Sequence, residues 1–189
     1  NTTNGDSVYI FGAQLEAGTY PTSYIPTYSV SATRAEDVCN KLDASGEINS
    51  TEGVLYAEIA ALENDSTNYK AISVSDGSIT NRVQFSLRQN AIVAFISSGG
   101  VGQYSYAHTV STTLNNHKVA LSYKANDFKF FVNGELINSI TSGITFPINS
   151  LTKLAFNDGG SAKFYGKTKA LVVYKEALTD AELATLTTI

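Results

Sequence analysis

Short stretches in which polar and apolar residues alternate with a period of two recur between residues 54 and 175, and no segment between these stretches has the period of a helix. Over residues 82–88, Val83, Phe85 and Leu87 point one way and polar side chains point the other, as in a half-buried strand of an antiparallel sheet. Parallel sheets need a crossover connection, usually a helix, between their strands. The sequence therefore predicts an antiparallel β fold. Predicted strands cover 54–62, 70–74, 82–88, 91–96, 118–124, 128–132, 135–140, 151–156, 162–166 and 169–175.

Turn and capping signals complete this prediction. The pair Asn133 and Gly134 lies between two predicted strands and indicates a hairpin, because both residues tolerate a positive φ. Only one helix is indicated, where Thr179 and Glu182 have the spacing of a capping box, and we expect it to end near Leu186. The predicted fold class is all-β, a two-sheet antiparallel sandwich with one short C-terminal helix.

The first 46 residues differ from the rest. Pro21 and Pro26 remove ladder donors and favour extended geometry in the residues before them, so residues 20–27 are expected to form an extended strap. The stretch 7–15 before it is typical of one strand, which cannot bury its face alone. We interpret residues 1–27 as the terminal strand and strap of a preceding β module, 28–46 as a linker, and 47–189 as the main sandwich domain.

Composition excludes several classes of protein. The net charge of −4 argues against non-specific nucleic-acid binding, which needs clustered Lys and Arg. No apolar run approaches the ~20 residues of a membrane span, so membrane insertion is not expected. The single Cys39 excludes an internal disulfide framework, and we expect it to be a buried thiol in the linker. The chain has no methionine, so we expect it to be a processed product or a fragment of a larger protein.

Three stretches together resemble a known family. They are residues 52–58, residues 117–134 with Phe131-Val132-Asn133-Gly134, and residues 164–183, which contain Val173-Tyr174 and the capping box. In order and spacing they are similar to the concanavalin A-like lectin/glucanase superfamily, on its laminin-G and pentraxin side. The resemblance implies a jelly-roll sandwich over about residues 47–189.

Residues 8–38 resemble a different set of proteins. The strand, the strap and the stretch Ala32–Val38 are similar to junctions in phage tail-fibre and tailspike proteins and in secreted bacterial adhesins. This resemblance implies a virion tail or an extracellular setting, with host or glycan recognition as the role. Three other roles remain open for the module: a structural spacer without ligand, a contact surface in a homotrimer, and a binding domain appended to a polysaccharide-degrading enzyme.

Catalysis is not expected. Retaining glycoside hydrolysis needs two carboxylates ~5 Å apart, and the alternating acidic motif of the family's glucanases does not occur. Glu58 is the only acidic residue in its predicted strand. His117 follows two asparagines just before a strand, where a turn role is expected.

The sequence instead predicts a carbohydrate-binding surface without catalysis. Sugars bind to aromatic faces, and amides, carboxylates and guanidinium groups reach their hydroxyls. Since the chain has no tryptophan, the aromatic platform must come from tyrosine or phenylalanine. For each candidate there is a competing interpretation: the tyrosines line the core, the strand face with the arginines is simply solvated, and the loop is a plain hairpin turn. The candidate residues are Arg82, Gln84 and Arg88 on one strand face, Tyr104, Tyr106 and His108 in a second cluster, and Asn157 in a loop.

A structural calcium ion is a further expectation. Many relatives hold Ca²⁺ through carboxylate, amide and backbone oxygens, as the chemistry of this cation requires. The loop carboxylates of this chain are isolated and form no D-x-D-x-D run. Asp158 is the one metal ligand that we nominate.

Overall fold

The structure, a computed structural model, describes residues 12–16, 23–33, 40–41 and 43–189. The chain forms two compact units, residues 1–38 and 39–189. The described residues of the first unit contain no strand or helix. Residues 12–15 of the predicted strand 7–15 are therefore not in a strand, and the rest of that prediction lies outside the described residues, as does Cys39.

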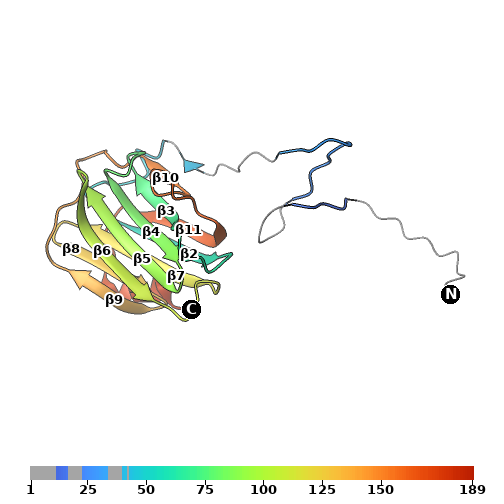
Figure 1. The fold of residues 1–189 in the computed structure, drawn as a ribbon. Helices are drawn as coiled ribbons and strands as arrows, with labels where there is room; N and C mark the ends of the chain where they lie inside the picture. Colours follow the sequence, from blue (N-terminus) through green and yellow to red (C-terminus); the bar gives the residue numbers. More distant parts are fainter. Residues whose placement is uncertain (1–11, 17–22, 34–39, 42) are drawn as a thin grey trace, which may run out of the picture. The chain divides into compact units, whose positions relative to one another are not determined.

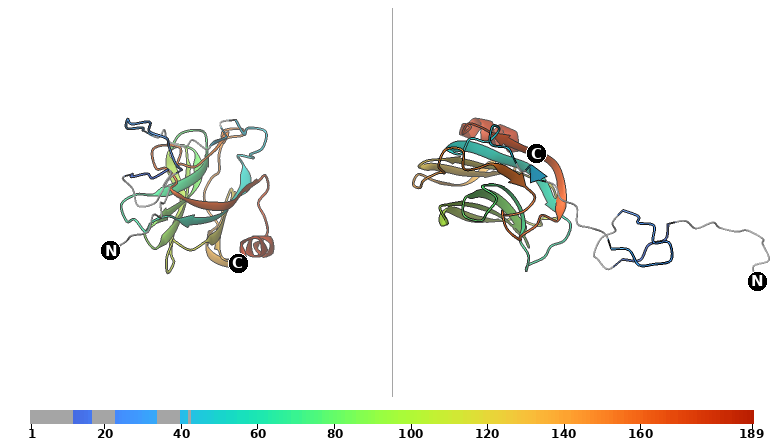
Figure 2. Two further views of the ribbon diagram at one scale, coloured as in Figure 1. Left: turned by 90° about the vertical axis from the view of Figure 1, so that its right-hand side faces the viewer. Right: turned by 90° about the horizontal axis from the view of Figure 1, so that it is seen from above.

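Two antiparallel sheets make up the second unit (Figure 1). One sheet has six strands in the order β1-β10-β3-β4-β5-β6, and the other has five in the order β11-β2-β7-β8-β9. Figure 2 shows the sheets as two layers, with α1 on the outside of the five-stranded sheet. The bounds are β1 Asn40–Lys41, β2 Glu52–Ala61, β3 Lys70–Ser75, β4 Arg82–Arg88, β5 Ala91–Ser98, β6 Val101–Thr109, β7 His117–Lys124, β8 Asp127–Val132, β9 Glu135–Ile140, β10 Lys153–Ala155, β11 Gly166–Tyr174 and α1 Asp180–Thr187.

Alternate residues of both sheets form one core between the layers. Val83, Phe85 and Leu87 of β4 are fully buried there. Phe85 faces Phe130 of β8 in the opposite sheet, with the ring centroids 6.1 Å apart. A second, smaller cluster lies between the five-stranded sheet and α1, where Leu183 is fully buried. The period-two pattern thus defines which face of β4 points inward and which points outward.

Tight turns set the register of neighbouring strands. Asn133 and Gly134 have φ values of 52° and 90°, which is the hairpin geometry predicted for this pair. The Asn133 side chain also accepts a hydrogen bond from the Lys118 backbone N–H at 3.0 Å. Gly99 and Gly100 join β5 to β6 in the same way, with φ values of 61° and 79°.

The predicted capping box is present at the start of α1. Thr179 Oγ1 accepts from the Glu182 backbone N–H, and Glu182 Oε2 accepts from the Thr179 backbone N–H at 2.8 Å. We expect Thr179→Ala to lower the free energy of unfolding by about 0.5–2 kcal/mol, measured by urea denaturation. Thr185→Ala, an exposed change within the same helix, is the control. Equal stabilities for the two variants would contradict this assignment.

The predicted all-β sandwich with one C-terminal helix is confirmed, but some element boundaries differ. The predicted strand over 162–166 is wrong for residues 162–165, where Lys163 makes only an isolated bridge with Asn157, and Gly166 is the first residue of β11. The sandwich also includes residues before the predicted start at 47, since β1 pairs with β10 and Ala44 is buried in the core. No described helix has the length and apolar character needed to span a membrane.

Candidate functional site

The outward face of the six-stranded sheet carries a row of polar side chains on β3 and β4. The inward side chains of β4 fill the core, so Arg82, Gln84 and Ser86 point to the opposite side of the sheet. Gln84 lies beside Ser73 of β3 on one side and Phe95 of β5 on the other. This row is buried although it faces away from the core, with Gln84 only 7% and Ser86 only 1% exposed.

Several polar atoms of this row have no hydrogen-bond partner. Six side-chain polar atoms among the described residues are both buried and unpartnered, and four of them lie here: Ser73 Oγ, Arg82 Nε, Gln84 Oε1 and Ser86 Oγ. A buried polar group left unpaired costs about 1–3 kcal/mol, so native proteins rarely gather such groups in one place. A polar ligand or bound water would supply the missing partners. We call this patch, together with Phe95, the β3–β5 face.

Arg82 and Phe95 form one end of the β3–β5 face. The Arg82 guanidinium carbon lies 5.1 Å from the centroid of the Phe95 ring, which is within the range of a cation–π interaction. Burial lowers the pKa of Arg82 and the nearby Asp158 carboxylate raises it, with burial the larger effect. The Phe95 side chain is half-buried, and Gly102 of β6 has no side chain to cover the ring, which a Cβ at that position would contact at 3.7 Å. Part of an aromatic surface is thus available next to Gln84.

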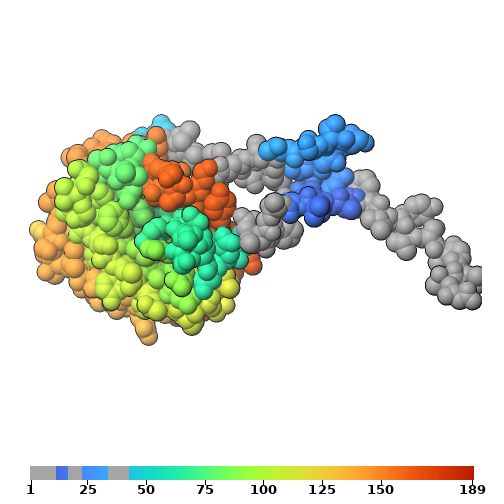
Figure 3. All heavy atoms as spheres, in the orientation of Figure 1, coloured from blue at the N-terminus to red at the C-terminus, as the bar shows by residue number. Residues whose placement is uncertain are grey.

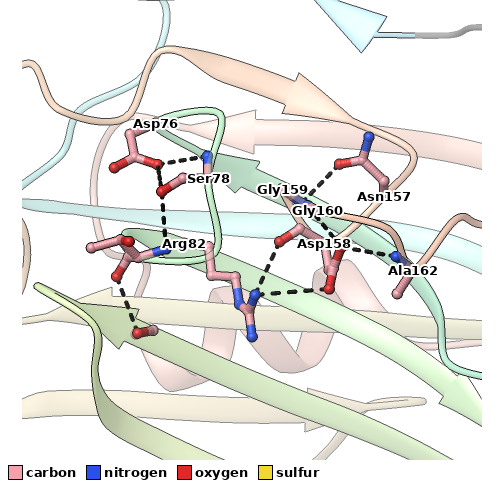
Figure 4. Close-up of polar contacts among 10 residues, drawn as sticks. Asp76, Ser78, Arg82, Asn157, Asp158, Gly159, Gly160 and Ala162 are labelled. Carbon is pink, nitrogen blue, oxygen red and sulfur yellow. Dashed lines mark hydrogen bonds and ion pairs between the residues drawn. The ribbon is translucent and has the colours of Figure 1, made fainter.

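A loop that follows β10 packs against this end of the face (Figure 4). Arg82 Nη1 donates to the Asp158 carbonyl oxygen at 3.2 Å and lies 3.8 Å from Asp158 Oδ2. Asp158 Oδ1 accepts from the backbone N–H groups of Gly160 and Ala162.

The same loop approaches the β3–β4 turn closely. Gly159 has a φ of 84°, and a Cβ there would collide with the Ser78 carbonyl oxygen. In Figure 3 this orange loop lies beside the green turn that joins β3 to β4. The sheet and the loop, far apart in the sequence, are therefore joined through Arg82.

The β3–β4 turn beside this loop is held by the Asp76 carboxylate. Asp76 Oδ1 accepts from the Ser78 backbone N–H and hydroxyl at 2.8 and 2.7 Å, and Oδ2 accepts from Asn81 Nδ2 at 2.8 Å. Burial raises the pKa of Asp76, but the hydrogen bonds together outweigh burial and leave this pKa below its ordinary value. The carboxylate form is therefore favoured by the fold.

This pKa shift predicts acid sensitivity of the turn. A group whose pKa is lowered by folding contributes stability above its unfolded-state pKa of about 3.9, and that contribution is lost as the pH falls through the lower folded-state pKa. We expect the melting temperature to fall below about pH 4, and to fall less steeply in Asp76→Asn. Thermal unfolding followed from about pH 6 to about pH 2.5 measures both slopes. Identical slopes would rule out a contribution from Asp76.

Arg88 holds a second loop at the opposite end of β4. Its Nε donates to the Ser66 carbonyl oxygen at 2.8 Å, and its Nη1 donates to the Tyr69 hydroxyl at 2.6 Å. The guanidinium also lies 4.8 Å from the centroid of the Tyr69 ring. Arg82 and Arg88 are six residues apart, about 20 Å along the strand. Each arginine therefore positions a loop at its own end of the β3–β5 face.

The second predicted cluster lies on the other side of the sheet. Tyr104, Tyr106 and His108 of β6 lie beside Ile96, Ala94 and Ile92, all three of which are buried in the core. Tyr104 is 3% exposed and stacks on Phe128, and burial raises its pKa. Tyr106 and His108 are more exposed because β6 is an edge strand. The six strand residues named as sugar ligands therefore belong to two opposite faces and cannot form one site.

The histidines have mainly structural surroundings. Burial and the nearby His117 lower the pKa of His108, and Glu135 raises it. His117 is the first residue of β7, and its Nε2 lies 2.9 Å from the Thr112 carbonyl oxygen. Its Nδ1 lies 3.1 Å from Asn133 Nδ2 in the β8–β9 hairpin. His117 thus joins the turn before β7 to that hairpin, as a turn role would require.

No single described strand places two acidic residues at the spacing of a glucanase pair. Among the described strands, only β2 contains two acidic residues, Glu52 and Glu58. The strand begins at Glu52, two residues earlier than predicted, so Glu58 is not its only acidic residue. Glu52 and Glu58 share a face but lie about 20 Å apart along the strand, far more than the ~5 Å of a retaining pair or the ~9.5 Å limit of an inverting one. Lys124 pairs with Glu52 and Lys169 with Glu58, each at 3.0 Å.

Asp158, the nominated calcium ligand, already has partners for both carboxylate oxygens. Oδ1 accepts two backbone hydrogen bonds, and Oδ2 faces Arg82. The described residues contain no group of three or more His, Cys, Asp or Glu side chains placed to hold a metal ion. Ca²⁺ takes six to eight oxygen ligands, which this surrounding does not offer without rearrangement. Calcium binding therefore stays a prediction.

Asn157 also stabilises the loop, because its Oδ1 accepts from the Gly159 backbone N–H at 2.8 Å. Two residues of the β3–β5 face were missed by sequence reasoning, Phe95 and Ser73. Residues 91–96 are all apolar, so the pattern of this strand does not show that Phe95 points outward. Only the register of β5 against β4 places that ring beside Gln84.

The family comparison agrees with this architecture. Residues 57–184 match the model of the concanavalin A-like lectin/glucanases superfamily. No curated protein matches the chain.

Solved structures with the same fold come from several organisms. The CBM40 of Ruminococcus gnavus IT-sialidase, bound to α2,3-sialyllactose, superposes with a TM-score of 0.62 at 17% identity, covering 82% of this chain and 97% of that one. The NanB sialidase of Streptococcus pneumoniae superposes with a TM-score of 0.58 at 15% identity, covering 78% of this chain and 26% of that one. A pentraxin of Limulus polyphemus superposes with a TM-score of 0.55 at 11% identity, covering 74% of this chain and 70% of that one. At these identities the likeness establishes the fold.

Proposed function

Because the chain belongs to the concanavalin A-like lectin/glucanase superfamily, we propose that its sandwich is a non-catalytic carbohydrate-binding module with the β3–β5 face as its binding surface. The observation that carries the proposal is the group of four unpartnered polar atoms on Ser73, Arg82, Gln84 and Ser86. Sugar hydroxyls both donate and accept hydrogen bonds, so a sugar that displaces the side chains now covering these buried atoms could pair with several of them.

Phe95 supplies the aromatic part of such a surface. Ligand sites combine apolar or aromatic walls with a few polar groups that fix orientation. The Phe95 ring lies directly beside Gln84 in the sheet, and it is only half-buried. The sialyllactose-bound CBM40 with the same fold supports a glycan ligand and makes sialyllactose the first probe.

A glycan array followed by titration calorimetry tests the proposal. We expect at least one glycan to bind with a Kd between about 1 μM and 1 mM. The measurement is run with Ca²⁺ and with a chelator, which also tests the predicted calcium ion. No binding at about 1 mM of any glycan, with calcium present, would overturn the proposal, and release of reducing sugars from a polysaccharide would overturn its non-catalytic part.

The kind of protein in which this module occurs is the second part of the proposal. We infer an extracellular module, in a virion tail or a secreted chain, from the resemblance of residues 8–38 to tail-fibre and adhesin junctions. The NanB sialidase contains this fold within 26% of its length, which supports the alternative of a binding domain appended to an enzyme. The complete sequence of the gene would distinguish these settings.

A further inference from the structure

Arg82 is the charged member of the β3–β5 face, whose other members are Ser73, Gln84, Ser86 and Phe95. A guanidinium group presents several N–H donors in a rigid plane, which suits carboxylate and phosphate groups. An unpaired arginine on a sugar-binding surface would therefore favour acidic sugars. The contacts of Arg82 decide whether its charge is free to do so.

The Asp158 carboxylate already balances the charge of Arg82. Arg82 Nη1 lies 3.8 Å from Asp158 Oδ2 and donates to the Asp158 carbonyl oxygen at 3.2 Å. The two side chains are only 15% and 18% exposed, so dissolved ions screen this pair less than a pair at an open surface. An anionic ligand that reached Arg82 would therefore meet a carboxylate at the same place.

The backbone of its own loop holds the Asp158 carboxylate beside Arg82. Oδ1 accepts from the backbone N–H groups of Gly160 at 2.8 Å and Ala162 at 3.0 Å (Figure 4). Gly159 lies so close to the β3–β4 turn that a Cβ would collide with the Ser78 carbonyl oxygen. Moving the carboxylate away from Arg82 would break both hydrogen bonds, so its negative charge stays in place when a ligand approaches.

The neighbouring charged side chains on this side of the sheet are also of opposite sign. Lys153 of β10 lies on the same side as Arg82, with Ser75 of β3 between them. The Lys153 ammonium packs against Gly77 in the β3–β4 turn. Asp76 precedes that glycine, and its hydrogen bonds favour the carboxylate form. Lys153 and Asp76 together therefore add no net charge beside Arg82.

The unpartnered neutral groups of the face fit hydroxyls better than carboxylates. Gln84 Oε1 is an acceptor, so it can pair with a sugar hydroxyl but not with an ionised carboxylate, which has no proton to donate. The hydroxyls of Ser73 and Ser86 can donate to either group, but they can accept only from a hydroxyl. A site built to hydrogen-bond a ligand hydroxyl discriminates against a ligand that lacks it.

We propose that the β3–β5 face selects uncharged sugars over sugars that carry a carboxylate or sulfate group, and that Asp158 determines this preference. The inference rests on the proposed function and names the ligand class of the same surface. Specificity is a difference between two affinities, and a repulsive group directed at the wrong ligand can set it. Asp158 is that group, since an acidic sugar near Arg82 must also approach the Asp158 carboxylate. The ligand would then differ in charge from the sialyllactose bound by the CBM40 of the same fold.

A glycan array that carries each neutral glycan beside an acidic form tests the ligand class. Its pairs include lactose with sialyllactose, N-acetyllactosamine with its sulfated form, and methyl-esterified oligogalacturonate with the free acid. A chelator is present so that no divalent cation neutralises Asp158. For the pair that binds, we expect calorimetry to give the neutral member a Kd at least about tenfold lower than that of the acidic member.

Asp158→Asn tests the residue. The change removes the negative charge but keeps an amide oxygen that can accept from Gly160 and Ala162, so the melting temperature should stay within a few degrees of wild type. The acidic member of the pair should bind at least about tenfold more tightly than it binds wild type, and the neutral member within about threefold. Glu58→Gln removes the same charge from the five-stranded sheet, where Glu58 pairs with Lys169, and should change neither affinity.

The outcomes separate this inference from the proposed function. Equal or tighter binding of the acidic member by the wild-type chain would overturn the inference while supporting a glycan-binding face. An affinity for the acidic member that is unchanged in Asp158→Asn, or that rises as much in Glu58→Gln, would overturn the role of Asp158. No binding of any glycan would overturn the proposed function and this inference with it. The wild-type comparison needs no variant, so it decides the ligand class even where Asp158→Asn is unstable.

Discussion

Phe95→Ala is expected to weaken glycan binding by at least about tenfold, which corresponds to 1.4 kcal/mol. The change removes the aromatic surface beside Gln84 and the ring under the Arg82 guanidinium. Truncation of a central aromatic residue commonly costs a binding site more than about 1–2 kcal/mol. Titration calorimetry with the best glycan from the array measures the loss.

Tyr106→Ala is the matched control for this prediction. Tyr106 is also a partly exposed aromatic residue of the same sheet, 36% exposed, but it lies on the inward face of β6. We expect it to leave glycan affinity within about twofold, less than 0.5 kcal/mol. Loss of binding in Tyr106→Ala with normal binding in Phe95→Ala would place the site at the side of the sandwich and refute the β3–β5 face.

Phe130→Ala is expected to lower the free energy of unfolding by about 3–5 kcal/mol. Phe130 is fully buried and packs across the layers against Phe85. Truncation therefore opens a cavity between two sheets whose strands are each fixed by their neighbours and cannot close it easily. Since domains of this size are stable by roughly 5–15 kcal/mol, the loss would be a large part of the total.

Urea denaturation measures this effect, with a shift of the midpoint at unchanged slope as the expected signature. Tyr165→Ala removes another aromatic ring, 45% exposed in a loop, and should cost less than about 1 kcal/mol. Similar losses for both variants would show that the layers do not pack through Phe130.

Most strands and the helix could be predicted because their signals are local, whereas β1 and β6 were not among the predicted strands. Alternation along residues 82–88 defines both faces of β4, and the capping box of Thr179 and Glu182 is contained within four residues. The strand prediction for residues 162–165 was wrong, and the cause is again a local one. Its alternation resembles a strand, but the Asp158 carboxylate binds backbone N–H groups of Gly160 and Ala162 and holds the preceding chain in a loop.

The candidate site was only partly predictable, because it depends on register and on contacts over long separations. Arg82 and Gln84 were found from the pattern of their own strand. Phe95 joins them only through the pairing of β5 with β4. Asp158 reaches Arg82 across 76 positions, and nothing near Asp158 in the sequence indicates an arginine partner.

The pairing of β1 with β10 determines how the sandwich should respond to tension. Among the described residues before β2, only Asn40 and Lys41 are paired as a strand in the six-stranded sheet, whereas β2 is hydrogen-bonded on both sides, to β11 and β7. A pulling force transmitted along the N-terminal unit would therefore detach β1 first and then withdraw the buried Ala44 and Ile48. The first yielding step extends the chain by about ten residues, roughly 30 Å, while the β3–β5 face and the ladder of β2 remain intact.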